Sequence, residues 1–188
     1  PASYLLLALI GGFLLMLSMG TSKVIAIAGA IAIAFCSYNL QIIQVGHNTK
    51  RQAIAYFPWV LAGVIFTYRA ALHGYRLPQA CGLRNNSKGN GAQEGESGIP
   101  SEESSWRSWL PKTVLGATLF AFALSMQIKA NHLQITYYLA IVIFTYAIGL
   151  LIYICTDSVR RSRMLKRFFA ASSLLLVIGC VGIATNAN

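Results

Sequence analysis

Long apolar runs without acidic residues set the strongest limit on what this chain of 188 residues can fold into. All five carboxylates lie in or beside hydrophilic connections, at Glu94, Glu96, Glu102, Glu103 and Asp157. An unpaired ion costs several kcal/mol in a hydrocarbon interior, so a charge-free stretch of about 20 residues is typical of a membrane-spanning helix. The sequence therefore predicts an integral membrane protein of the all-α class.

We expect a polytopic transmembrane helix bundle of six spans, at about residues 3–20, 24–45, 53–74, 113–128, 133–155 and 168–185. The third segment is the least regular, because Pro58 lies near its start and Arg69 near its end. Arg69 can extend its charge to the membrane interface while its stem stays in the apolar region. The alternative is a bundle of five spans, in which this segment forms a re-entrant or surface helix.

A polar connection divides the chain into two membrane halves. Residues 84–103 are rich in Gly, Ser, Asn and Glu and lack a core-forming apolar pattern, which is typical of a flexible loop. We expect a first membrane half over residues 1–75, a polar flexible cytoplasmic loop over 76–112 and a second membrane half over 113–188. Trp106 and Trp109 are typical of anchors at the membrane interface.

The two halves show a weak similarity to each other. Leu-Ser-Met ends the first segment at Met19 and the fourth at Met126, and AIAFCSY at 32–38 corresponds to AIVIFTY at 140–146. Units of three spans would insert in opposite orientations, and inverted repeats of this kind are used by many transporters. Chance similarity between apolar sequences is the alternative interpretation.

The distribution of cations predicts which side of the membrane faces the cytoplasm. With six spans, twelve Lys and Arg residues collect on one side, and three collect on the other, at Lys50, Arg51 and Lys129. The positive-inside rule then places both chain ends outside the cytoplasm. The five-span arrangement obeys the rule too, with the amino-terminal end moved inside. We expect the membrane to be a bacterial or organellar inner membrane.

Three alanines predict a close contact between helices in the second segment. Ala26, Ala30 and Ala34, here called the alanine ridge, recur at four-residue spacing and share one face of a helix. Small residues at this spacing let two helix backbones approach closely. The alanine ridge is interpreted either as the contact face for a partner helix, in this chain or in another, or as ordinary alanine-rich packing.

Amide side chains form the main polar group expected at one side of the membrane. They lie near the end of the second segment and around the turn between the fourth and fifth, at Asn39, Gln41, Gln44, Gln127, Asn131 and Gln134. Such amides can line a neutral vestibule or join one helix to another by hydrogen bonds.

A basic run precedes the last apolar segment, at Arg160, Arg161, Arg163, Lys166 and Arg167. It is amphipathic enough to lie on a surface of anionic headgroups, and docking of an acidic partner is the alternative. The net charge of +10 would suggest nucleic acid for a soluble protein. Because these cations flank apolar runs, we expect the lipid bilayer as their partner and not nucleic acid.

Residues that usually indicate catalysis or metal binding are sparse. A single aspartate leaves no credible Ser–His–Asp set, and the four cysteines lack a metal-ligand spacing. A bis-histidine haem needs facing ligands at matching depth, and only His47 with His132 meets that condition, both in expected turns. The sequence indicates no catalytic or metal-binding residue and leaves the cofactors unknown.

Three functions remain, in order of preference. The first is a non-enzymatic membrane subunit that packs within a larger assembly, with other membrane subunits or a second copy as its partner. The alternative is a transporter or channel for a small neutral solute or ion, which the inverted repeat would suit. The third is a haem- or pigment-associated electron-transfer subunit, which is based on the histidines alone.

Overall fold

A computed structural model describes residues 2–46, 48–72, 102–156 and 161–186. Its elements are helices, α1 (Ala2–Ser18), α2 (Lys23–Ala34), α3 (Ser37–Val45), α4 (Asn48–Ala71), α5 (Glu102–Lys129), α6 (Leu133–Thr156) and α7 (Arg161–Ala184). Five spans are long and apolar enough to cross a membrane, namely α2 with α3, α4, α5, α6 and α7. The predictions of an all-α fold and of a multi-pass membrane protein are confirmed.

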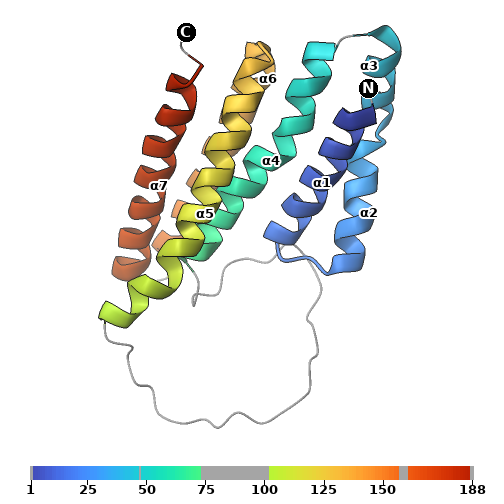
Figure 1. The fold of residues 1–188 in the computed structure, drawn as a ribbon. Helices are drawn as coiled ribbons and strands as arrows, with labels where there is room; N and C mark the ends of the chain where they lie inside the picture. Colours follow the sequence, from blue (N-terminus) through green and yellow to red (C-terminus); the bar gives the residue numbers. More distant parts are fainter. Residues whose placement is uncertain (1, 47, 73–101, 157–160, 187–188) are drawn as a thin grey trace.

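The helices lie side by side; α3 continues α2 in the same direction, and otherwise successive helices run up and down the bundle in turn (Figure 1). The start of α1 and the end of α7 lie at the same end of the bundle, and α4 stands between the two outer groups of helices. α4 contacts α1, α3, α5, α6 and α7. In the most apolar 18-residue stretch of α4, 56% of the residues are buried inside the bundle, against 17% in the corresponding stretch of α6. The segment that contains Pro58 and Arg69 is therefore the centre of the bundle and not a helix on its surface.

The contact between α4 and α5 is the most extensive in the bundle, and small residues on both helices make it possible. A Cβ atom added to Gly63 would lie 2.7 Å from the backbone nitrogen of Phe120. A Cβ atom added to Gly116 would lie 2.6 Å from the Thr67 hydroxyl, which donates to the Gly63 carbonyl oxygen at 2.7 Å. Glycine at these positions lets the two backbones approach, as small residues do in membrane helix pairs.

α1 packs between α2 and α4 in the same way. Gly12 lies against Ala30 of α2, where an added Cβ would be 3.2 Å from the Ala30 Cα. The Trp59 ring of α4 occupies the space over Gly11, and its indole nitrogen donates to the Leu7 carbonyl oxygen at 2.8 Å. These contacts join α1 both to α2 and to the central helix α4.

The carboxyl-terminal end of α1 is closed by a Schellman motif. The Gly20 amide donates to the Leu17 carbonyl oxygen at 2.9 Å and the Thr21 amide to the Met16 carbonyl oxygen at 3.3 Å. This geometry requires a left-handed residue, and Gly20 supplies it with φ of 84°. The guanidinium of Arg69 donates from Nη1 to the Ser18 carbonyl oxygen at 2.9 Å. Arg69 thus joins α4 to the negative end of the α1 dipole.

The second predicted segment is interrupted, because α2 ends at Ala34 and α3 begins at Ser37. Cys36 is extended, with φ of −59° and ψ of 147°, so the helical hydrogen bonds stop there. The Asn39 side chain donates from Nδ2 to the carbonyl oxygens of Ile33 at 3.0 Å and Ala34 at 3.2 Å. These bonds satisfy acceptors that the end of a helix leaves open in a membrane.

The amino-terminal and carboxyl-terminal helices pack differently. α1 has an extensive contact with α2, whereas α5 touches α6 only slightly. α1 contacts α4, and α5 contacts α7. The helix α5 also begins earlier than expected, at Glu102, so the end of the predicted 76–112 loop is helical.

Candidate functional site

Two of the six residues predicted to form a polar amide cluster instead stabilise a helix break and a turn. Asn39 is buried and closes the break between α2 and α3. Asn131 has a positive φ of 53°, and its backbone N–H donates to the Ile128 carbonyl oxygen at 2.8 Å. Asparagine tolerates this left-handed conformation better than most residues, so Asn131 turns the chain from α5 into α6.

The other amides do not combine with them into one site. Gln41 and Gln44 are exposed on α3, and Gln134 is exposed beside Tyr138 with a long Nε2 to hydroxyl distance of 3.4 Å. No hydrogen bond joins any two of the six amides, all of which the structure describes. Within the described residues these amides are not joined to one another by direct hydrogen bonds, and each has its own surroundings.

Gln127 is the most unusual of the six. Its side chain is fully buried, and neither Oε1 nor Nε2 has a hydrogen-bond partner. It continues the buried stripe of α5 formed by Ala117, Phe120 and Ala123, at spacings that place all four on one helix face. An amide buried without partners costs about 1–3 kcal/mol, so the Gln127 side chain lowers the stability of the folded bundle.

Arg51 is a second buried polar group, and its burial was not foreseen from the sequence. Its side chain is 5% exposed and its Nε has no hydrogen-bond partner. The guanidinium donates from Nη2 to Asn48 Oδ1 at 3.2 Å and lies 5.2 Å from the centre of the Tyr4 ring. The adjoining cavity of about 10 Å³, which Asn39 also lines, has room for about one water molecule.

Arg51 therefore takes part in holding α1 to the start of α4, through a cation–π contact. The sequence showed it only as one of the charges that count toward topology, because Tyr4 lies far away along the chain. A charge beside an apolar run, with an aromatic residue at matching depth in another span, is the signal that would have found it.

The alanine ridge lies within the bundle. Ala26, Ala30 and Ala34 are at most 2% exposed, and α1 is the helix against which α2 packs most extensively. Of the two helices offered by the sequence as partners, one in this chain or one in another, the structure places one of this chain on the ridge.

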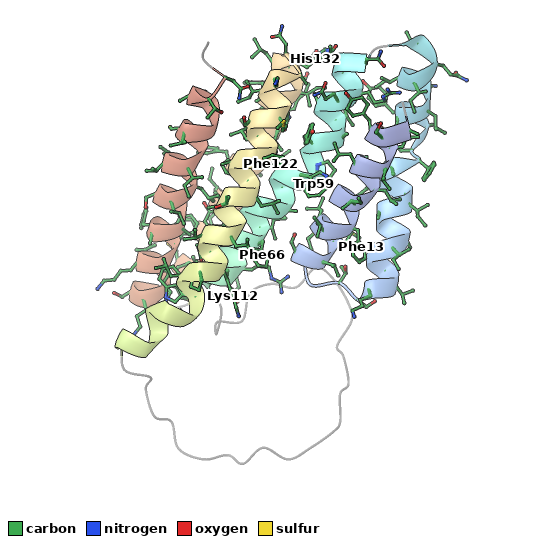
Figure 2. All side chains as sticks on the ribbon, in the orientation of Figure 1. Phe13, Trp59, Phe66, Lys112, Phe122 and His132 are labelled. Carbon is green, nitrogen blue, oxygen red and sulfur yellow. The ribbon has the colours of Figure 1, made fainter. Side chains whose placement is uncertain are left out.

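The basic run forms the start of α7 and continues directly into its apolar part. Arg163 and Lys166 are exposed, whereas Arg167 places its guanidinium 5.6 Å from the centre of the Trp109 ring on α5. Arg160 lies outside the described residues, as does the side chain of Arg161. The start of α7 lies at the end of the bundle where Lys112 is labelled (Figure 2).

His132 lies at the opposite end, in the turn between α5 and α6 (Figure 2). His47 and His73 fall outside the described residues, and so does the predicted pair of His47 with His132. No protein-family model, no curated protein and no solved structure matches this chain.

Proposed function

We propose that this chain is a non-enzymatic subunit of a larger membrane assembly, in a bacterial or organellar inner membrane. The support comes from α6, the least buried span, only 17% of whose apolar window lies inside the bundle. It packs on α4 and α7 and touches α5 only slightly. A span held this loosely by its own chain has most of its surface open to a helix of another polypeptide.

Gly149 of α6 is the single observation that carries the proposal. Seven other glycines within the described spans lie against a neighbouring helix of this chain, at Gly11, Gly12, Gly29, Gly63, Gly116, Gly179 and Gly182. A Cβ atom added at Gly149 would meet nothing within 4 Å. Because small residues in this bundle mark close helix contacts, Gly149 marks a contact that this chain alone does not fill.

The face around Gly149 suits a partner helix. Its neighbours on that face are exposed and of mixed size, namely Tyr138, Val142, Thr145 and Ile152. Thr145 and Gly149 are four residues apart, which is the spacing that lets another backbone approach. Large side chains on either side would then pack around the partner.

Purification in mild detergent tests the proposal. We expect the wild-type particle to contain other polypeptides and the Gly149→Leu variant to lose them, while its helix content stays unchanged. Ala140→Leu is the matched control, because Ala140 is also exposed and lies on the opposite side of α6, nine residues from Gly149 at about 100° per residue. A wild-type protein that purifies alone, or a Gly149→Leu variant that keeps its partners, would contradict the proposal.

We propose that the chain crosses the membrane six times, because α1 crosses it in addition to the five longer spans. The 17 residues of α1 extend about 25 Å at 1.5 Å per residue, slightly less than a hydrocarbon core of about 27–30 Å. Both chain ends would then face away from the cytoplasm. In a Ser3→Cys variant, with the native thiols controlled for, the new thiol should react with an impermeant reagent in intact cells. A second label at position 188, which lies outside the described residues, reports the other chain end. Protection at position 3 together with labelling at position 188 would favour five spans.

The broken second span supports a second candidate, a transporter or channel for a small neutral solute or ion. Discontinuous membrane helices line the substrate sites of many transporters built from inverted three-span repeats. The break at Cys36, with carbonyl acceptors held by Asn39, is such a discontinuity. Flux into liposomes that contain only this protein tests this candidate, and absence of flux under solute, proton and sodium gradients would remove it.

A further inference from the structure

A groove between α5 and α7 opens on the outside of the bundle. Its volume is about 260 Å³, and its lining comes from both helices, namely Trp109, Leu110, Thr113, Ala170, Ser173, Leu174 and Val177. The two hydroxyls in this lining bond to their own helices, Thr113 to the Trp109 carbonyl oxygen at 2.9 Å and Ser173 to the Ala170 carbonyl oxygen at 3.0 Å. The groove therefore presents an apolar surface.

Cations stand at one end of this groove. Arg163 and Lys166 precede Ala170 by seven and four residues, so they lie on the same face of α7 as the groove lining. Both side chains are exposed. Arg167 stacks on Trp109, with 5.6 Å between its guanidinium and the centre of the ring, and so brings a third positive charge to the groove wall.

The apolar lining of the groove and the cations beside it favour one kind of occupant. The groove volume of about 260 Å³ lies below the range of about 300–1,000 Å³ for sites of compact organic ligands. An apolar groove between two membrane helices fits a hydrocarbon chain. Positive charge at one end fits an anionic phosphate, and tryptophan is typical of headgroup depth.

We propose that this groove binds one anionic phospholipid, with an acyl chain between α5 and α7 and the phosphate at Arg163, Lys166 and Arg167. The chain gains apolar contact along Leu110, Leu174 and Val177. The phosphate oxygens accept hydrogen bonds from the ammonium and guanidinium groups. This site is distinct from the Gly149 face of α6, so it does not depend on the proposed assembly.

Native mass spectrometry of the purified chain tests the site. The protein in detergent is mixed with equal amounts of phosphatidylglycerol and phosphatidylcholine, which differ in headgroup charge, and the bound fraction of each lipid is measured. We expect the wild type to retain one phosphatidylglycerol in preference. Lys166→Gln and Arg163→Gln should each reduce that retention about fivefold, the effect of one charge at a membrane surface.

Two matched controls separate the groove from general attraction. Lys23→Gln removes an exposed cation from the start of α2, away from α5 and α7 at the same end of the bundle (Figure 1), and should leave retention unchanged. Ala170→Leu, which fills the groove, should reduce retention, whereas Ala184→Leu should not, because Ala184 is exposed 14 residues further along α7, about 21 Å away.

Three outcomes would overturn the proposal. They are equal retention of the two lipids by the wild type, an effect of Lys23→Gln as large as that of Lys166→Gln, and unchanged retention in Ala170→Leu. Circular dichroism of each variant shows whether it is folded. If Lys166→Gln does not fold, Arg163→Gln and Ala170→Leu test the headgroup and chain positions separately.

Discussion

Gly63→Ala tests whether close approach of α4 and α5 stabilises the bundle. The added Cβ would lie 2.7, 2.8 and 2.9 Å from the nitrogen, Cα and Cβ of Phe120. None of these atoms is the far end of a flexible side chain, so the helices themselves must move. Raising the shortest distance from 2.7 Å to the 3.4 Å at which ordinary contact begins requires a shift of about 0.7 Å.

The cost follows from that shift. A gap of about 0.5–1 Å removes about a quarter to a half of the dispersion energy of each affected contact, and α4 with α5 is the most extensive helix pair. Overpacking of this kind typically costs about 1–3 kcal/mol, and alanine recovers up to about 1 kcal/mol over glycine in a helix. We therefore expect the free energy of unfolding to fall by up to about 2 kcal/mol.

Unfolding by SDS in mixed micelles, followed by circular dichroism, measures this difference. Gly149→Ala, measured on the chain separated from other polypeptides, is the matched control, because the same methyl group enters open space there. We expect it to leave stability unchanged or to raise it slightly. A Gly63→Ala variant at least as stable as the wild type would refute the reasoning that the glycine is required for the approach of α5.

Three further changes test other contacts by the same unfolding measurement. Ala30→Leu should separate α1 from α2 and destabilise the protein by about 1–3 kcal/mol, whereas Ala28→Leu, on an exposed side of α2, should not; equal effects would contradict the packing of the alanine ridge. Gln127→Leu should stabilise by about 1–3 kcal/mol, because it removes an amide buried without partners, and a loss of stability would show that the amide has a partner in solution. Arg69→Met should cost about 1.5–3 kcal/mol through loss of the charged bond to the Ser18 carbonyl, and an unchanged stability would mean that solvent satisfies that carbonyl equally well.

The positions of the helices could be predicted from the sequence because the membrane imposes them. Charge-free runs have few alternatives to helix in hydrocarbon, so each predicted segment overlaps a helix of the structure. The interruption at Cys36 could not be predicted, because no glycine or proline marks it. It depends on Asn39, whose side chain replaces the missing backbone donors, and a hydropathy pattern does not register a single amide.

The arrangement of the helices was less accessible for a similar reason. Pro58 and Arg69 suggested that the third segment could be a re-entrant or surface helix, yet it is the central helix of the bundle. Arg69 is placed by a carbonyl oxygen 51 residues away along the chain, and Arg51 by the ring of Tyr4. Partners this distant become visible only when the spans are packed, so the sequence could show these charges only as topology signals.

The central place of α4 has a consequence for how the protein is made. The ribosome delivers α1 to α3 into the membrane before α4 is complete, and at that stage Gly11 faces no Trp59 and the Ser18 carbonyl has no Arg69. α5 and α7 follow α4 in synthesis and pack on its other side. α1 and α2, whose contact is extensive, can pack together before α4 is complete, whereas the contacts with Trp59 and Arg69 form only after α4 is inserted.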